Sequence, residues 1–145
     1  MGVNAACLAD DPAAPHSYKL YCPPLRTSPR VARDFVTSVL RTLDLTSAVD
    51  AAALCTSELV TNTYLHAGGA GSLLWLAIEL PTVRVTVYDD NPTEPTSHPV
   101  PDYGEHGRGL QLVGSLADKW GVCQGAPLGL GGTRGKGVWF VLAAG

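Results

Sequence analysis

Charged residues are scarce in this sequence, and their small excess is negative. Of the 145 residues, 16% are charged and 46% are hydrophobic, and 10 Lys and Arg against 13 Asp and Glu give a net charge of −3. A chain with so little charge and so much apolar surface is not disordered as a whole. Its acidic balance argues against broad electrostatic attraction to nucleic acid or to an anionic membrane, so any phosphate must be held locally.

The sequence also lacks paired cysteines, a long apolar run and a basic N-terminal region. Its four cysteines form no CxxC pair, which indicates reduced thiols rather than a zinc cluster or a secreted disulfide scaffold. No stretch approaches the roughly 18 apolar residues of a membrane helix. We therefore expect a cytoplasmic protein in which residues 1–16 are a disordered or frayed lead and residues 17–145 form one domain.

Apolar periodicity predicts alternating strands and helices. Ser28 is expected to cap the first helix, in which Val31, Phe35, Val39 and Leu43 recur at steps of four. The expected strands cover residues 17–22, 73–80, 83–89, 121–124 and 138–142, and the expected helices cover 28–43, 47–66 and 110–120. The first strand ends in two prolines and suits a sheet edge. This order predicts an α+β fold, a two-layer sandwich with about three helices on one face of a mainly antiparallel, mixed sheet.

The second predicted helix carries an unusual set of polar residues. At 100° per residue, Glu58, Asn62 and His66 lie within the same sector as apolar residues such as Leu54 and Leu65. Buried polar groups need partners, which can be protein groups, water, a metal or a ligand. Internally satisfied polar groups remain an alternative, but the spacing of four favours a site.

Two glycine-rich segments and one strand end are further candidates. Gly107-Arg108-Gly109 precedes a predicted helix, where free amides attract anions, although a flexible helix entry explains it equally well. Residues 129–137 fail the GxxxxGK[ST] test, so a mobile hairpin loop with two solvated cations is favoured there. Asp89 is either a base-recognising acceptor or turn chemistry, and taken alone the turn is favoured. Cys55, on the apolar face, is expected to be a core residue rather than a nucleophile.

Four segments occur in the order and spacing of a known superfamily. They are ELVTNTYLHA (58–67), VTVYDDNP (85–92), GRGLQLVGSLADKWGV (107–122) and GKGVWFVL (135–142). On these segments the sequence resembles the small ATP-binding domains of gyrase, histidine kinases and mismatch-repair ATPases, which share the Bergerat ATP-binding fold. Within that superfamily it is similar to the single-domain anti-sigma-factor serine kinases of actinomycetes.

The resemblance implies ATP and Mg²⁺ as cofactors and a role for each matching residue. Asn62 would coordinate the Mg²⁺ that bridges the phosphates, and Glu58 would be the general base. Asp89 would accept a hydrogen bond from the adenine amino group. Matches to other nucleotide-binding positions, mostly near the phosphates, are His66, Gly107, Arg108, Gly109, Leu110 and Thr133.

The resemblance also implies a function in regulation. The expected protein transfers the γ-phosphate of ATP to a serine or threonine of an anti-anti-sigma partner, or sequesters a sigma factor, or does both. An alternative is a non-catalytic nucleotide-binding module that sequesters a transcription-regulatory partner, and a structural domain without ligand is a third. Retention of Glu58 favours the enzyme, whereas Asp90, Asn91 and Pro92 replace the superfamily's DxGxG pattern and favour the module. Residues 91–106 resemble a short lid over ATP. A homodimer is kept as an alternative to a single copy of the chain.

Overall fold

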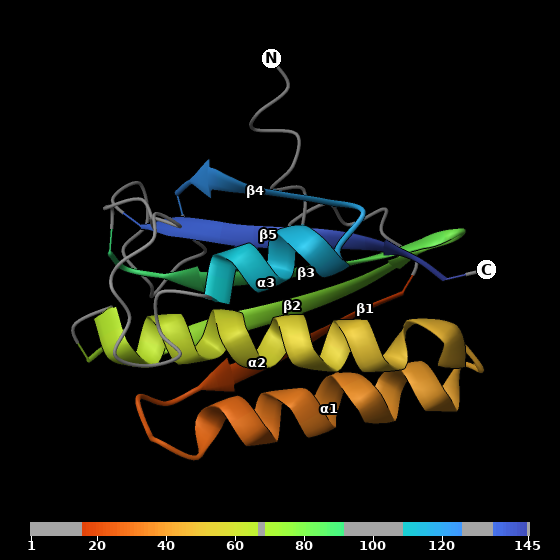
Figure 1. The fold of residues 1–145 in the computed structure, drawn as a ribbon. Coiled ribbons are helices and arrows are strands. Elements are labelled where there is room, and N and C mark those ends of the chain that lie inside the picture. The colour runs from red at the N-terminus through yellow and green to blue at the C-terminus, as the bar shows by residue number, and fades with distance from the viewer. Residues whose placement is uncertain (1–15, 67–68, 92–108, 126–134, 145) are drawn as a thin grey trace.

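A five-stranded sheet with helices on one face makes up the molecule, as the computed structural model shows for residues 16–66, 69–91, 109–125 and 135–144 (Figure 1). The strands are β1 (His16–Cys22), β2 (Ser72–Glu79), β3 (Thr82–Asp89), β4 (Lys119–Gln124) and β5 (Lys136–Ala143). The helices are α1 (Ser28–Thr42), α2 (Val49–His66) and α3 (Gly109–Leu116), and a 3₁₀ turn at Thr46–Ala48 precedes α2. The predicted α+β sandwich is therefore confirmed.

The sheet has the strand order β1-β2-β3-β5-β4, and every pairing between these strands is antiparallel. β1 lies at an edge, and β2 and β3 form a hairpin, as the sequence predicted. The chain's last strand, β5, does not lie at the other edge but runs between β3 and β4. In this antiparallel pairing Asp89, at the end of β3, lies beside Lys136, at the start of β5.

The first helix buries a different stripe from the predicted one. Ala32, Val36 and Leu40 are fully buried, whereas Val31 is 54% exposed. The sequence holds two neighbouring apolar stripes at steps of four, and a helix buries the middle of the combined arc, so the stripe that starts at Val31 lies at its margin. The predicted cap is also displaced, because Thr27 is the N-cap residue and the Ser28 hydroxyl donates to the Pro23 carbonyl at 2.6 Å.

The third helix is shorter than its apolar pattern suggests. It ends at Leu116, and β4 starts at Lys119, where the predicted helix still continued. The Asp118 amide donates to the Val141 carbonyl at 2.9 Å, and the Asp118 carboxylate accepts from the Ala143 amide at 2.7 Å. Pairing with β5 therefore overrides the helical pattern for these residues.

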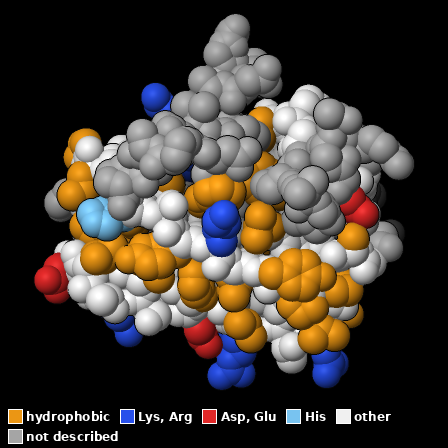
Figure 2. Space-filling model, turned by 180° about the vertical axis from the view of Figure 1, so that it is seen from behind, with side chains coloured by type: hydrophobic (Ala, Val, Ile, Leu, Met, Phe, Trp, Pro, Cys, Tyr) orange, Lys and Arg blue, Asp and Glu red, His pale blue; other side chains and the backbone are white. Residues whose placement is uncertain are grey.

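The two faces of the sheet differ in what covers them. One face, with Leu76, Val85 and Phe140 at its centre, packs under the described helices as the main core. The other carries a second cluster around Trp75 and Tyr88, and Figure 2 shows hydrophobic side chains gathered on that side with Lys and Arg among them. No helix in the described ranges is both long and apolar enough to cross a membrane.

The cysteines divide into two classes. Cys22 and Cys55 are buried free thiols, whereas Cys123 is disulfide-bonded. The prediction of reduced thiols is therefore correct for the first two and wrong for Cys123. The sequence did not predict that bond, because its cysteines form no recognisable disulfide or CxxC motif.

Candidate functional site

The polar residues of α2 lie at the boundary of the core rather than inside it. Glu58 and Asn62 are half-buried, and His66 in the last turn is exposed. The predicted apolar sector around them is only partly buried, since Leu54 is 41% and Leu65 is 38% exposed. Burial alone therefore does not require a ligand at this helix face, and the case for a site depends on what approaches it.

The first residue of α3 approaches both Glu58 and Asn62. A Cβ added at Gly109 would stand 3.0 Å from Glu58 Oε1 and 3.4 Å from the side-chain nitrogen and oxygen of Asn62. Glycine at this position therefore lets the start of α3 lie against the two side chains. The N-terminal amides of a helix attract anions, so a carboxylate, an amide and an anion-binding helix end lie together here. Leu110, next along α3, is buried and anchors that end in the core.

Cys55 is a buried thiol near Glu58 on α2. Burial first, and the charge of Glu58 second, raise the pKa of the Cys55 thiol from 9.0 to about 11. A thiol in this state is protonated at neutral pH and is a poor nucleophile. Cys55 is thus a core residue rather than a nucleophile, as expected.

Asp89, at the end of β3, is in a buried ion pair that the sequence analysis did not predict. It lies opposite Lys136 in the β3–β5 pairing, and the two residues are 3% and 5% exposed. Lys136 Nζ donates to Asp89 Oδ1 at 2.8 Å and to Oδ2 at 3.0 Å. The Asn91 amide also donates to Oδ1 at 2.9 Å, so the turn chemistry expected for Asp89 is present as well.

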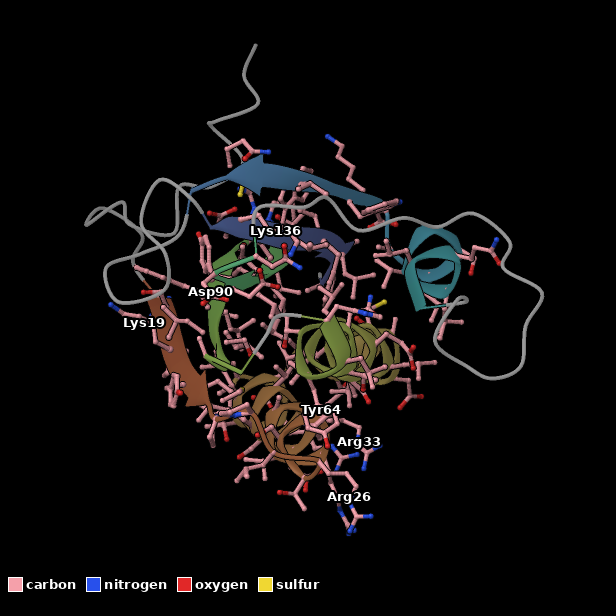
Figure 3. All side chains as sticks on the ribbon, turned by 90° about the vertical axis from the view of Figure 1, so that its left-hand side faces the viewer. Lys19, Arg26, Arg33, Tyr64, Asp90 and Lys136 are labelled. Atoms are coloured by element: carbon pink, nitrogen blue, oxygen red, sulfur yellow. The ribbon has the colours of Figure 1, made fainter. Side chains whose placement is uncertain are left out.

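Asn91 links this pair to α2. Its side-chain nitrogen donates to the carbonyl of His66 at 2.9 Å, which satisfies one of the open carbonyls at the helix end. Its own carbonyl accepts from Lys136 Nζ at 3.0 Å. Figure 3 shows Lys136 and Asp90 near the strand ends, whereas Arg26, Arg33 and Tyr64 lie toward the helical layer. Hydrogen bonds through Asn91 therefore join Asp89, the candidate for adenine recognition, to the end of α2, the helix that carries Glu58 and Asn62.

Lys136 is the residue that sequence reasoning misjudged. It was expected to be one of two solvated cations in a loop, but it is buried at the start of β5. The signal was the period-two alternation of the last strand, in which Lys136 shares its face with Val138 and Phe140. Three predicted site residues, Gly107, Arg108 and Thr133, lie outside the described residues.

The protein side chains alone offer little for a metal ion. Within the described ranges, no group of three or more His, Cys, Asp or Glu residues could hold one. An Mg²⁺ ion needs about six oxygen ligands and usually takes several from waters and phosphates. The Asn62 amide oxygen, beside the start of α3, fits a site of that shared kind and not a site built from protein groups alone.

Comparison with known proteins identifies a family and a similar fold among solved structures. A family model described as histidine kinase-like ATPase domain matches residues 22–130. No curated protein sequence matches this one. Among solved structures, the RsbU and RsbW domains of Rv1364c from Mycobacterium tuberculosis match with a TM-score of 0.62 and 15% sequence identity. That match covers 88% of this chain and 32% of the other, so it supports the fold over about a third of the relative's length.

Proposed function

The chain belongs to the histidine kinase-like ATPase domain family, and from this premise we propose that it binds ATP with Mg²⁺ and acts as a protein serine/threonine kinase. The observation that carries the proposal is the approach of Gly109 to both Glu58 and Asn62. A nucleotide's phosphates need an anion-binding backbone and an oxygen ligand for their metal, and a hydroxyl nucleophile needs a base. These three requirements coincide where α2 meets α3.

Each residue has a separate task in the transfer. The substrate hydroxyl oxygen forms a bond to the γ-phosphorus, the bond from that phosphorus to the ADP oxygen breaks, and Glu58 holds the hydroxyl proton. Asn62 offers its amide oxygen to the metal, and the amides at the start of α3 face the phosphates. Mg²⁺ supplies neutralisation of phosphate charge when it is bound. Asp89 reads the adenine amino group, and His66 is assigned to the phosphates on the resemblance alone.

The proposed partner is a protein of the anti-anti-sigma kind, or a sigma factor. The support is that a structure containing an RsbW domain shares this fold, and that the sequence resembles anti-sigma-factor kinases. At 15% sequence identity, that structure does not identify the partner of this chain. The assignment therefore depends on the resemblance of the motif segments. Such a role would make the chain a cytoplasmic regulator of transcription without direct contact to nucleic acid.

A second candidate is a binding module whose ATP occupancy sets partner affinity without transfer. The observation in its favour concerns Asn91, which stands at or beside a glycine position of the superfamily's DxGxG pattern. Asn91 is hydrogen-bonded to His66 and to Lys136. A strand end fixed in this way has less freedom to rearrange during a reaction cycle. Under this alternative Glu58 has no proton to accept.

Transfer of labelled phosphate from ATP separates the two candidates. A partner captured from lysate with and without Mg-ATP is incubated with the full chain and labelled ATP, and Asn62→Ala serves as the metal-site variant. The kinase proposal expects Mg²⁺-dependent labelling of a serine or threonine and loss of most of the metal's contribution to ATP binding in the variant. If no partner is labelled at saturating Mg-ATP, the kinase proposal is wrong and the binding module is the remaining candidate. If wild type and Asn62→Ala each bind ATP equally well with and without Mg²⁺, Asn62 is not a metal ligand.

A further inference from the structure

The Asp89–Lys136 pair has an uneven pattern of hydrogen bonds. Among the described residues, Oδ1 of Asp89 accepts from both Lys136 and the Asn91 amide, whereas Oδ2 accepts from Lys136 alone. A carboxylate oxygen has two acceptor positions. Oδ2 therefore keeps one acceptor position that no described group fills.

Lys136 is held as firmly as the carboxylate that it contacts. Its ammonium donates to both oxygens of Asp89 and to the Asn91 carbonyl, and its side chain is buried at the start of β5. Two charges in such a place are costly unless they are paired and hydrogen-bonded, and here both conditions are met. The carboxylate plane is thus fixed from the side of β5 and not only by its own backbone.

We propose that Lys136 is a positioning residue for base selection: its ammonium fixes the Asp89 carboxylate so that Oδ2 presents an acceptor to the amino group of adenine. The inference rests on the proposed nucleotide binding and deepens it. An acceptor fixed at this position favours a base with an exocyclic amine there over guanine, whose corresponding group is a carbonyl oxygen. Lys136 acts through Asp89 and does not itself need to contact the nucleotide.

Two other roles for Lys136 make different predictions. If the pair only stabilises the fold, removing the ammonium weakens the affinities for ATP and GTP by the same factor. If Lys136 blocks the carboxylate from the base, removing it strengthens ATP binding. Positioning predicts a third result, in which ATP affinity falls while GTP affinity changes little.

The test is calorimetric titration of the full-length chain with ATP and with GTP. The variants are Lys136→Met, which removes the charge at similar length, and Lys136→Arg, which keeps it. Lys119→Met is the matched control, because Lys119 is an exposed lysine at the start of the neighbouring strand β4. For Lys136→Met the preference for ATP over GTP is expected to fall about tenfold, the size of one charge-assisted hydrogen bond. The control is expected to keep the wild-type preference.

The Arg variant covers a failure of the Met variant to fold. A planar guanidinium keeps the charge but cannot place one nitrogen on both carboxylate oxygens and on the Asn91 carbonyl together. Its preference for ATP is therefore expected to lie between those of the wild type and Lys136→Met. An unchanged preference in the folded variants, or tighter ATP binding, overturns the positioning role and leaves the proposed function standing. A wild type that binds neither nucleotide overturns the proposed function and this inference with it.

Discussion

The two halves of the candidate site are built in opposite ways. The first, which we call the open half because its side chains are only half-buried, lies where α2 meets α3 and places Glu58 and Asn62 against a glycine. The second, which we call the closed half, lies at the end of β3 and the start of β5, where Asp89 and Lys136 are almost fully buried and bonded to each other. The first region is suited to chemistry that changes charge and proton position during a cycle. The second is suited to recognition, because fixed groups discriminate best between similar ligands.

The largest expected effect comes from removing the base in the open half. Glu58→Gln keeps the shape and hydrogen bonding of the side chain but removes its basicity. Because general-base assistance contributes about 10² to 10⁴ in rate, transfer to the captured partner should fall by that order while ATP affinity stays within a few fold. Single-turnover kinetics with labelled ATP measures the transfer step. Equal rates for the two proteins would remove Glu58 from the mechanism.

The next effect is expected from breaking the Asp89–Lys136 ion pair in the closed half. Asp89→Asn leaves the buried Lys136 ammonium without its counter-charge, and breaking a buried pair in this way typically costs about 3 to 5 kcal/mol. The free energy of unfolding from denaturant titration should fall by that amount, together with ATP affinity. In Asp89→Asn/Lys136→Met no unpaired charge remains, so part of the stability should return. If the single variant is as stable as the wild type, the ion pair does not have the structural weight that its burial implies.

The approach of α3 to α2 can be altered by one methyl group. In Gly109→Ala the new Cβ would stand 3.0 Å from Glu58 Oε1, closer than nine in ten such contacts. The Glu58 side chain can shift by a few tenths of an ångström, so the fold should survive while the base is displaced. We expect transfer to fall about tenfold with little change in the unfolding midpoint, since small misplacements at a reacting centre are costly. Gly114→Ala in the same helix is the control, because its new Cβ would stand 3.2 Å from Trp120 Nε1, a similarly tight contact away from Glu58.

A further expected effect is a pH dependence of the stability at Cys55, beside Glu58 in the open half. The Cys55 thiol has its pKa raised from 9.0 to about 11, so the folded chain keeps a proton that the unfolded chain loses in between. This contribution to stability is fully present below pH 9 and is lost as the pH rises toward 11. The stability difference between wild type and Cys55→Ala, from denaturant titrations at several pH values, should therefore narrow across that window. A constant difference would mean that the thiol titrates alike in both states.

The sequence predicted the open half better than the closed half. Glu58, Asn62 and His66 are close in the chain, so helical spacing was enough to group them, and the end of α2 at His66 was correct. Asp89 and Lys136 are 47 residues apart, and only the pairing of β3 with β5 brings them together. Local patterns also failed where a tertiary contact decided the outcome, as at the end of α3 and for the buried stripe of α1.

The insertion of β5 between β3 and β4 has a consequence for how the chain is made. A ribosome makes β5 after β3 and β4, so until β5 emerges β3 has an unpaired edge and β4 lacks its described neighbour in the sheet. Asp89 also has no counter-charge at that stage, because Lys136 arrives with the same strand. Closing the sheet and completing the Asp89–Lys136 ion pair are thus one event, and a nascent chain that stops before Lys136 has neither.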